Sequence, residues 1–267
     1  MVDLKIIESI IEKQIKNFSK KYFKKMIEQK NDPEGLINSK INNIFVSSMG
    51  KEISFYSALV RSLESSLGNL VQNIGIELAK ETYEFSDNVN GVISTSQINA
   101  ISTLLNSYHN GIKKPELIDL KIIDDAFDKD KNYTNQYTSD FYLTDKQTGE
   151  NYLIELKAGG DLDNKKAESE KRAILEQYCI LKNSLGQHAK IKIYFATAYN
   201  MCGEGNFWKQ ERVRAYFSNE ELLIGRDFWN FILKSDTGFN LVKSYFEKHS
   251  SLIESELKNL RTIYGIN

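Results

Sequence analysis

The sequence contains few of the residues that disulfide frameworks, zinc sites and histidine-based catalysis require. Of its 267 residues, two are cysteines and three are histidines. The cysteines, Cys179 and Cys202, lack the short spacing of metal ligands, and the histidines are scattered along the chain. These absences argue against a zinc, thiol or histidine mechanism. The scarcity of cysteine is typical of a reducing compartment, so we expect a cytoplasmic protein.

Proline and long apolar runs are also scarce. With two prolines in the chain, flexible proline-rich tethers are not expected. No apolar stretch is long enough to cross a bilayer, so no membrane partner is expected. Residues 1–18 alternate charged residues with isoleucine at helical spacing, which predicts an amphipathic helix and not a signal peptide.

The overall charge is balanced, with 35 basic and 36 acidic residues and a net charge of −1. A strongly basic protein would indicate a nucleic-acid partner, but a basic patch is local and the total need not reveal it. The net charge therefore neither excludes nor indicates binding to DNA. A hydrophobic content of 41% and a charged content of 27% are ordinary for a soluble globular protein.

The first part of the chain has the apolar spacing of helices. Apolar residues recur at helical intervals in residues 3–30, 54–84 and 95–110. Asn31-Asp32-Pro33 is expected to end the first helix, and Pro115 marks a boundary.

After Pro115 the pattern changes to strands that alternate with helices. Strands are predicted at residues 117–123, 137–143, 152–158 and 191–198, and a helix at residues 165–185. A loop follows at residues 200–205, then a segment of open type at 207–217, and helices at 225–234 and 237–263. This order predicts an α/β fold with a mixed central sheet flanked by helices, and with helical additions at both ends. We expect a helical region over 1–115, a core over 116–217 and a C-terminal helical region over 218–267, forming one compact unit.

Two predicted strands carry the residues of greatest chemical interest. Asp140 lies in the first, and Glu155-Leu156-Lys157 lies in the second. The polar stretch 144–151, which includes Gly149, predicts a hairpin turn between them. Because side chains alternate across a strand, Glu155 and Lys157 share one face while Leu156 points into the core. An antiparallel partner would bring Asp140 to the same end. Two carboxylates and an ammonium suit metal-assisted cleavage of a phosphodiester.

A structural alternative remains open for these residues. Glu-x-Lys is short, and it recurs at Glu28–Lys30 and Glu256–Lys258 within predicted surface helices. The tripeptide at residues 155–157 would then be an exposed strand face with a cross-strand ion pair to Asp140. Its surroundings favour the site. The small residues Ala158-Gly159-Gly160 leave room for a ligand, and the helix that follows opens with lysines that suit phosphates.

Asp140 and Glu155-Leu156-Lys157, followed by a helix and a further strand, resemble the PD-(D/E)XK nuclease superfamily over roughly residues 117–200. Ser65–Gly68 followed by Glu77, and Gly225-Arg226-Asp227-Phe228-Trp229, are similar to segments of type II restriction endonucleases of that superfamily, in particular a subgroup that cuts GG-N-CC-like palindromes. One departure is Ser139, which stands where a proline often precedes the aspartate.

The resemblance implies a role for each matching residue. Asp140 and Glu155 would bind Mg²⁺ together with the backbone carbonyl of Leu156, and Glu77 would reach the metal through water. Lys157 would orient the attacking water and offset charge on the phosphorane. Asp140, Glu155 and Lys157 are thus the expected catalytic residues.

Several assignments stay open at this stage. Asp124 and Asp125 compete with Asp140 for the first carboxylate role, because they follow the predicted strand 117–123. Glu77 is alternatively a solvated helical residue beside Lys80. Gln177 either lines the site, as a glutamine does in RecB-like members, or is an ordinary polar position on an amphipathic helix.

Basic residues after the Glu-x-Lys tripeptide are the candidates for DNA contacts. The helix at 165–185 offers phosphate contacts from Lys165, Lys166, Lys171 and Arg172. Residues 200–217 are the candidate recognition segment, in which base-reading groups would come from Lys209, Gln210, Arg212 and Arg214. Alternatively, this segment is a β-hairpin whose apolar residues pack into the core, namely Phe207, Trp208, Val213, Tyr216 and Phe217. Phe228 and Trp229 are expected to be core aromatics.

The predicted function is that of a Mg²⁺-dependent, sequence-specific endonuclease acting on double-stranded DNA, a type II restriction enzyme. An enzyme that cuts palindromes is expected to be a homodimer, because a two-fold site matches a two-fold protein. The system would include a cognate DNA methyltransferase. The alternatives are a repair or junction-resolving nuclease of the same superfamily, a non-catalytic DNA-binding module on the same core, and an all-helical regulator without the predicted strands.

Overall fold

The computed structural model describes residues 2–266, apart from the side chain of Ile41. The chain forms two compact units, one made of residues 78–239 and the other of residues 2–77 together with the chain from Asn240 onward. The sequence analysis placed its boundaries at 115/116 and 217/218, and that functional division stays a prediction.

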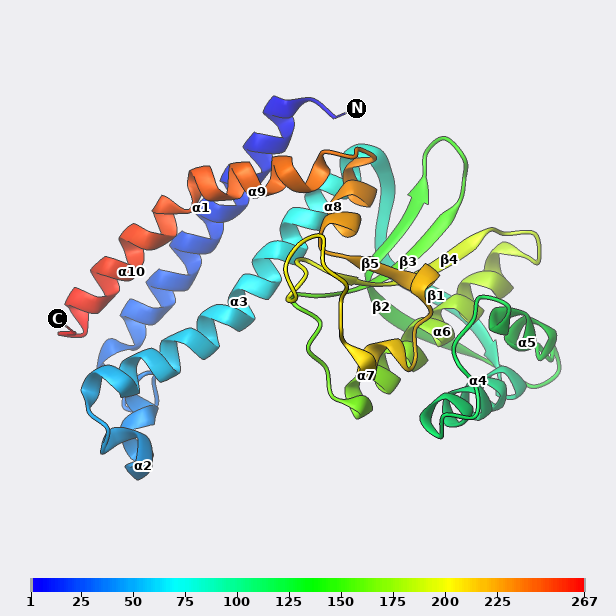
Figure 1. Cartoon of the computed structure of the whole chain (residues 1–267), viewed down its shortest axis with the longest axis horizontal. Helices are drawn as coiled ribbons and strands as arrows, with labels where there is room; N and C mark the ends of the chain where they lie inside the picture. The colour runs from blue at the N-terminus through cyan, green and yellow to red at the C-terminus, as the bar shows by residue number, and fades with distance from the viewer. Residues whose placement is uncertain (1, 267) are drawn as a thin grey trace. The chain divides into compact units, whose positions relative to one another are not determined.

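The first unit is built on a mixed five-stranded sheet (Figure 1). Its strands are β1 (Tyr83–Ser94), β2 (Asn132–Asp145), β3 (Asn151–Lys157), β4 (Ile191–Thr197) and β5 (Leu222–Ile224), and they lie in this order across the sheet. β2 pairs antiparallel with both β1 and β3. β4 pairs parallel with both β3 and β5. The predicted α/β class with a mixed sheet is confirmed.

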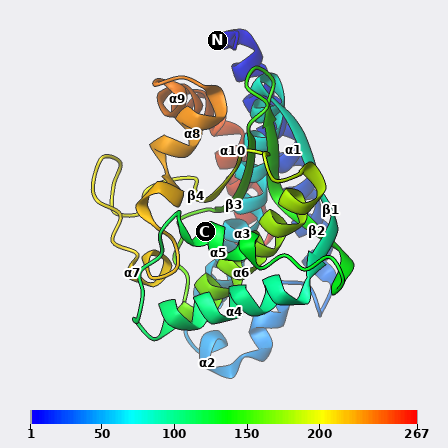
Figure 2. The ribbon, with the colours of Figure 1, turned by 90° about the vertical axis from the view of Figure 1, so that its right-hand side faces the viewer.

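Helices cover both faces of this sheet (Figure 2). On one face, α4 (Thr95–His109) and α6 (Asn164–Leu185) contribute to a core that includes Leu153 of β3 and Phe195 of β4. On the other face, the rings of α8 (Arg226–Leu233) meet those of the strands, and the Phe231 and Tyr152 centroids are 5.0 Å apart. β3 is therefore buried on both sides over most of its length, whereas the sequence predicted a half-buried strand. Parallel crossovers place helices on both faces of a sheet, which accounts for this difference.

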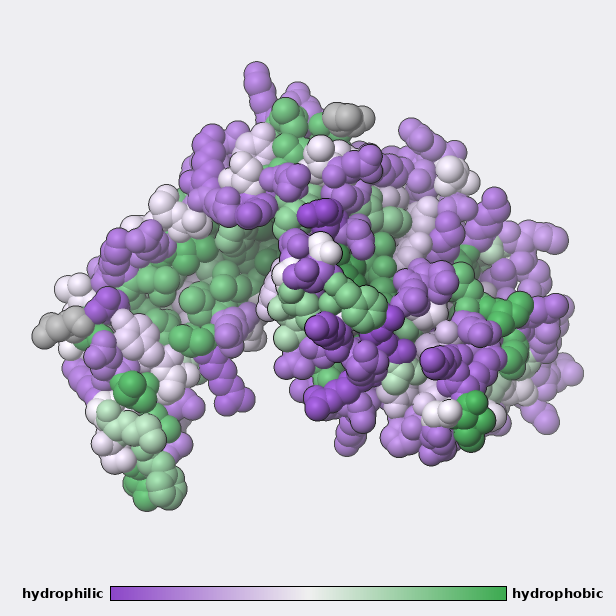
Figure 3. Space-filling view, viewed as in Figure 1, coloured by the Kyte–Doolittle hydropathy of each residue, from purple (hydrophilic) through white to green (hydrophobic). Residues whose placement is uncertain are grey.

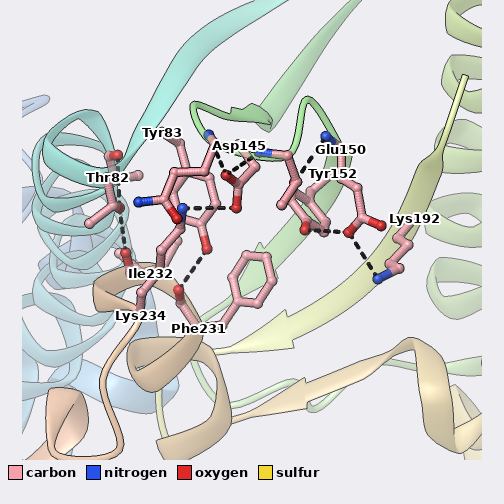
Figure 4. A network of polar contacts seen from close by, with 12 residues as sticks. Thr82, Tyr83, Asp145, Glu150, Tyr152, Lys192, Phe231, Ile232 and Lys234 are labelled. Carbon is pink, nitrogen blue, oxygen red and sulfur yellow. Dashed lines mark hydrogen bonds and ion pairs between the residues drawn. The ribbon is translucent and has the colours of Figure 1, made fainter. Parts of the chain in front are cut away.

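The hairpin between β2 and β3 forms as predicted. Asp145 ends β2, and its Oδ1 accepts hydrogen bonds from the backbone N–H groups of Gln147 at 2.8 Å and Thr148 at 3.1 Å. Gly149 takes a φ of 69°, which favours glycine. The other oxygen of Asp145 lies 2.8 Å from Nζ of Lys234, the residue that follows α8 (Figure 4). The hairpin is thus held to the helix that covers its far face.

The predicted strand at residues 117–123 is wrong, because this segment contains helix α5 (Asp119–Asp125). Asp119 is buried at its first turn and accepts hydrogen bonds from the Tyr108 hydroxyl at 2.6 Å and from the backbone N–H of Glu116 at 3.1 Å, and it pairs with Lys113. These contacts to α4 and the connecting loop select the helix. A short apolar run alone does not distinguish a strand from a buried helix.

Three further segments differ from the sequence expectation. Residues 83–94 form β1, and residues 222–224 form β5, where no strand was predicted. Residues 207–217 contain the short helix α7 (Glu211–Arg214), so the alternative of a β-hairpin there is wrong. Trp208, Val213, Tyr216 and Phe217 nevertheless join the core of this unit, as that alternative expected.

The second unit is helical and is assembled from both ends of the chain. Its elements are α1 (Leu4–Glu28), η1 (Gln29–Asn31), η2 (Asn38–Asn42), α2 (Ile44–Ser47), α10 (Ser251–Ile263), and most of α3 (Lys51–Thr82) and α9 (Gly238–His249). The two ends are joined directly, since the Tyr264 hydroxyl donates to the Met26 carbonyl at 2.8 Å and Lys248 pairs with Glu8 at 2.5 Å.

Apolar side chains are exposed at one end of this helical unit. Ile44, Phe45 and Met49 are 70%, 74% and 67% exposed, and Figure 3 shows green, hydrophobic atoms in the region that Figure 1 labels α2. Within residues 2–266, none of the helices combines the length and hydrophobicity that crossing a bilayer demands.

Candidate active site

The pairing of β2 with β3 places the two predicted carboxylates opposite each other. The last paired residues are Phe141 and Ile154, and one further step in the same register sets Asp140 across from Glu155. Directly opposed residues of an antiparallel pair project from the same face. Ladder pairing stops there because Oδ2 of Asp140 accepts a hydrogen bond from the backbone N–H of Leu156 at 2.9 Å. The side chain of Asp140 therefore lies in the gap where the two strands separate.

The backbone of Leu156 faces the same gap. The carbonyl of the next residue, Lys157, accepts a hydrogen bond from the N–H of Ala198 at 3.1 Å, just beyond the end of β4. Successive peptide groups of a strand point to alternate edges. The N–H and the carbonyl of Leu156 consequently point toward β2, where Asp140 lies. The carbonyl that the sequence analysis expected to bind metal thus lies on the edge of β3 that faces β2.

Lys157 brings a third carboxylate into the site. Its Nζ lies 2.5 Å from Oε1 of Glu155 and 3.1 Å from Oε1 of Glu170, which projects from α6. The side chains of Lys157, Glu155 and Glu170 are 28%, 13% and 24% exposed, so the cluster is mostly shielded but open to solvent on one side. The sequence analysis gave Glu170 no role. Its position on the same helical stripe as Gln177 was the signal that it faces the sheet.

Burial and like charge perturb the pKa values of the cluster. Burial, followed by the nearby charge of Asp140, raises the pKa of Glu155 well above its usual range, and Lys157 opposes this only in part. Burial disfavours the charged form of Lys157, but Glu155 and Glu170 outweigh it and hold the pKa of Lys157 above its ordinary value. The site has a deficit of positive charge around Glu155.

The donor set fits a hard divalent cation. Two carboxylates and a main-chain carbonyl meet at one gap, and Mg²⁺ prefers oxygen ligands while keeping several waters. A cation there would relieve the repulsion between Asp140 and Glu155 that raises the pKa of Glu155. Over the part of the chain that the structure describes, no group of three or more His, Cys, Asp or Glu side chains is arranged as a metal cluster. Glu77 lies on α3 in the other unit, and its role stays a prediction.

The rival carboxylates lie on α5, and one of them contacts α6. Oδ2 of Asp124 accepts a hydrogen bond from the Tyr178 hydroxyl at 3.0 Å, and burial raises the pKa of Asp124. Asp125 is exposed at the end of α5. Gln177 is buried on α6, and its Oε1 has no hydrogen-bond partner, so its relation to the site stays open.

The candidate DNA-contacting residues fall into two groups. Four are exposed or make few contacts within the chain, namely Lys165, Lys166, Lys209 and Arg212. Three make intramolecular contacts. Arg172 donates to Ser102 Oγ at 2.9 Å, Gln210 lies 2.7 Å from the sulfur of Met201, and Arg214 lies over the ring of Phe207 at 4.4 Å.

The expectation that Lys171 contacts a DNA phosphate is wrong. It is buried, with its Nζ 2.6 Å from Oε1 of Glu221 and 4.7 Å from the centroid of the Phe217 ring. Glu221 in turn accepts a hydrogen bond from the backbone N–H of Ser218 at 2.8 Å. A lysine on a helix among basic neighbours is expected to be exposed to solvent. The sequence alone does not reveal that Lys171 pairs with Glu221, 50 residues further along the chain.

Comparison with known proteins identifies the family. A family model described as "Type II restriction endonuclease, HinfI" matches residues 5–250, which is most of the chain and includes the whole candidate site. No curated protein matches the sequence. On the extent of this match, the chain belongs to the HinfI family of type II restriction endonucleases.

Proposed function

We propose that this site-specific deoxyribonuclease cuts double-stranded DNA at a short palindrome, using Mg²⁺ at a PD-(D/E)XK-type site made of Asp140, Glu155 and Lys157. Membership of the HinfI family makes the protein a sequence-specific DNA endonuclease and hence a protein that acts on double-stranded DNA. The metal, the palindrome and the three residues are our proposal.

One observation carries the assignment of the site, namely the register that sets Asp140 across from Glu155 on a shielded face. Like charges placed directly opposite each other destabilise a sheet. A fold keeps such a pair where a cation offsets the repulsion, and type II restriction enzymes generally act with a divalent metal. The position of Lys157 next to Glu155 completes the arrangement.

The chain's own residues have separate tasks in the proposed reaction. Asp140, Glu155 and the Leu156 carbonyl hold the cation, and Asp140 also fixes the separation of the strands through the Leu156 N–H. The bound metal supplies Lewis acidity and lowers the pKa of a water. The ammonium of Lys157, always charged because its pKa is raised, orients the attacking water and offsets charge that develops on the phosphate.

DNA contact is proposed for the basic residues around the site. Lys165 and Lys166 lie in the first turn of α6, which Asp163 caps by accepting the N–H of Lys166 at 2.8 Å. Exposed lysines at a helix N-terminus suit phosphate oxygens. Residues 200–217 are proposed as the base-reading segment, with Lys209 and Arg212 exposed there and Arg172, Gln210 and Arg214 becoming available by exchanging partners.

Cleavage of plasmid DNA tests the proposal directly. With Mg²⁺ the protein should convert mixed plasmid DNA into discrete fragments, and EDTA should prevent this. Asp140→Ala and Lys157→Ala should each lower the cleavage rate by about 100-fold or more, with DNA binding in Ca²⁺ retained. Asp124→Asn, at the rival carboxylate, is the matched control and should keep cleavage.

Other outcomes would favour the competing functions. A smear would indicate a non-specific nuclease, and plasmid that stays intact under all metals would indicate a non-catalytic DNA-binding module. Loss of cleavage in Asp124→Asn together with its retention in Asp140→Ala would move the site to α5.

Three features of the biological setting are also proposed. The enzyme is a homodimer, because a protein with two-fold symmetry fits a palindromic DNA site, which has the same symmetry. A restriction enzyme must leave its host DNA uncut, so a cognate DNA methyltransferase is expected in the same system. The two cysteines, Cys179 and Cys202, are both free, which agrees with a cytoplasmic location.

A further inference from the structure

We propose that Glu170 is a positioning residue for Lys157. Its carboxylate holds the ammonium at the active site and thereby leaves Glu155 to the metal. This inference rests on the proposed function of the site and deepens it.

Lys157 and a divalent cation compete for the same carboxylate. Nζ of Lys157 lies 2.5 Å from Oε1 of Glu155. A cation bound between Asp140 and Glu155 needs the oxygens of Glu155 as well. Two positive charges within a few ångströms of each other repel, so the ammonium must have another anion to remain at the site.

Glu170 is that second anion. Its Oε1 is 3.1 Å from Nζ of Lys157, and it comes from α6, an element separate from the β2–β3 hairpin that supplies the metal ligands. When the metal binds Glu155, the ammonium keeps its pair with Glu170 and stays within reach of the attacking water. Without Glu170, the ammonium of Lys157 would pair with Glu155 alone, and metal binding would have to break the Lys157–Glu155 ion pair.

The orientation of Glu170 is fixed by its neighbour along the chain. Lys171 is fully buried and pairs with Glu221 at 2.6 Å, and Ala167 and Ile174 on the same helix are also buried. These contacts set the rotation of α6 about its axis. Glu170 is therefore held toward the end of β3 by the packed interior, and the anchor for Lys157 exists before metal or DNA binds.

Titration calorimetry with Mn²⁺ alone, on the full-length protein without DNA, tests the inference without relying on cleavage. Lys157→Met should tighten Mn²⁺ binding, because a competing cation is removed. Glu170→Gln should weaken Mn²⁺ binding by threefold or more. In the Lys157→Met background, the same Glu170→Gln change should have little effect, since its role passes through the lysine.

The matched control is Glu168→Gln, two residues away on α6. It carries the same change of charge, but Glu168 contacts His109, Arg172 and Tyr216 and not Lys157. Its effect on Mn²⁺ affinity should be well below that of Glu170→Gln, and thermal unfolding should confirm that both variants are folded. Glu170→Asp, which keeps the charge, should recover part of the wild-type affinity.

The outcomes separate this inference from the proposed function. If wild type binds Mn²⁺ and Asp140→Asn abolishes binding, the metal site stands. The role of Glu170 is then overturned if Glu170→Gln leaves Mn²⁺ affinity unchanged, or if it lowers that affinity equally in the presence and absence of Lys157. Either result leaves the proposed nuclease site intact. If wild type binds no Mn²⁺, or Asp140→Asn binds as well as wild type, the metal site itself fails.

Discussion

At the scale of single residues, α6 carries two adjacent charged side chains with opposite fates. Glu170 is partly open to solvent and contacts Lys157, the proposed catalytic lysine, whereas Lys171 is buried in the core with Glu221. Burial lowers the pKa of Lys171, and the charge of Glu221 works against that shift. A buried ion pair contributes little net stability, but it becomes costly when one partner is removed. The pair therefore fixes geometry more than it stabilises the fold.

Removing one member of this pair should be strongly destabilising. Lys171→Met leaves the Glu221 carboxylate buried without its cation, and we expect a loss of about 3–5 kcal/mol in the free energy of unfolding, measured with urea. Lys171→Met combined with Glu221→Leu should recover a large part of this loss. Lys258→Met is the control, because its pair with Glu254 is 71% and 65% exposed and its loss should hardly change the stability.

A second residue-scale prediction concerns pH. The ion pair with Lys234, assisted by the turn N–H groups of Gln147 and Thr148, holds the pKa of Asp145 below its ordinary value. A carboxyl whose folded pKa is lowered contributes stability above its unfolded pKa, about 3.9, and loses it as the pH falls through the folded value. Lys234→Met should thus cost about 1 kcal/mol at pH 6, and the pH-dependent part of that cost should vanish in strong acid.

The comparison needs unfolding curves of wild type and Lys234→Met between pH 6 and pH 2. The control is Lys146→Met. Lys146 lies in the same turn as Asp145, but its Nζ donates to the Lys80 carbonyl at 2.9 Å. It should show no change of this kind over the same range. A cost for Lys234→Met that is equal at both ends of the range would contradict the assignment of the shift to the Asp145–Lys234 pair.

At the scale of elements, the long and strongly periodic segments were predictable and the short or polar ones were not. Helices near residues 4–28, 95–109 and 164–185 follow from apolar spacing. The β2–β3 hairpin follows from two alternating runs around a polar turn. For these elements the local pattern and the tertiary packing agree, which is why sequence alone sufficed.

β1 shows why the rest was not predictable. Its middle, Ser86-Asp87-Asn88, is polar and irregular in pairing with β2, and such residues disfavour strands. Gly91 is needed because α6 passes so close that a Cβ there would lie 2.3 Å from Ser184 Oγ. Both features depend on partners distant in sequence. The same holds in the site for Glu170, which only the packing of α6 brings to Lys157.

The loop before α8 offers a prediction at this scale. Gly225 has a φ of 54°, and a Cβ there would lie 2.8 Å from the backbone nitrogen of Asn200 and 2.4 Å from Oε1 of Glu204. Glu204 is not free to move away, since it accepts hydrogen bonds from the N–H groups of Asn200 at 2.7 Å and Arg226 at 3.1 Å. The glycine that opens the segment 225–229 is therefore required by space as well as by conformation.

Two alanine substitutions compare this crowded glycine with one that has open space around it. Gly149→Ala meets no atom within 4 Å at a φ of 69°, so it should cost only the strain of a left-handed residue, about 1–2 kcal/mol. Gly225→Ala should cost at least about 1 kcal/mol more, because a ψ of −106° lies outside the left-handed helical region and because loop and helix must also shift. Equal urea midpoints for the two variants would show that space around Gly225 is not limiting.

At the scale of the whole molecule, the expected active form is a pair of chains. We predict that sedimentation equilibrium in the presence of Ca²⁺ and cognate DNA gives a protein component of twice the 30.7 kDa chain mass, since each subunit would supply one site for one strand. A component of 30.7 kDa that still cuts both strands at one site would contradict the homodimer.

The order in which the two units are completed follows from how the chain is divided between them. The sheet unit is one continuous stretch, residues 78–239, so a ribosome finishes it before the last helices emerge. The helical unit must wait, because α1 precedes the sheet unit in the chain whereas α10, which lies against α1, follows it. Until α10 is made, α1 lacks its contact with that helix, and a chain cut short before α10 would contain a complete sheet unit and an incomplete helical unit.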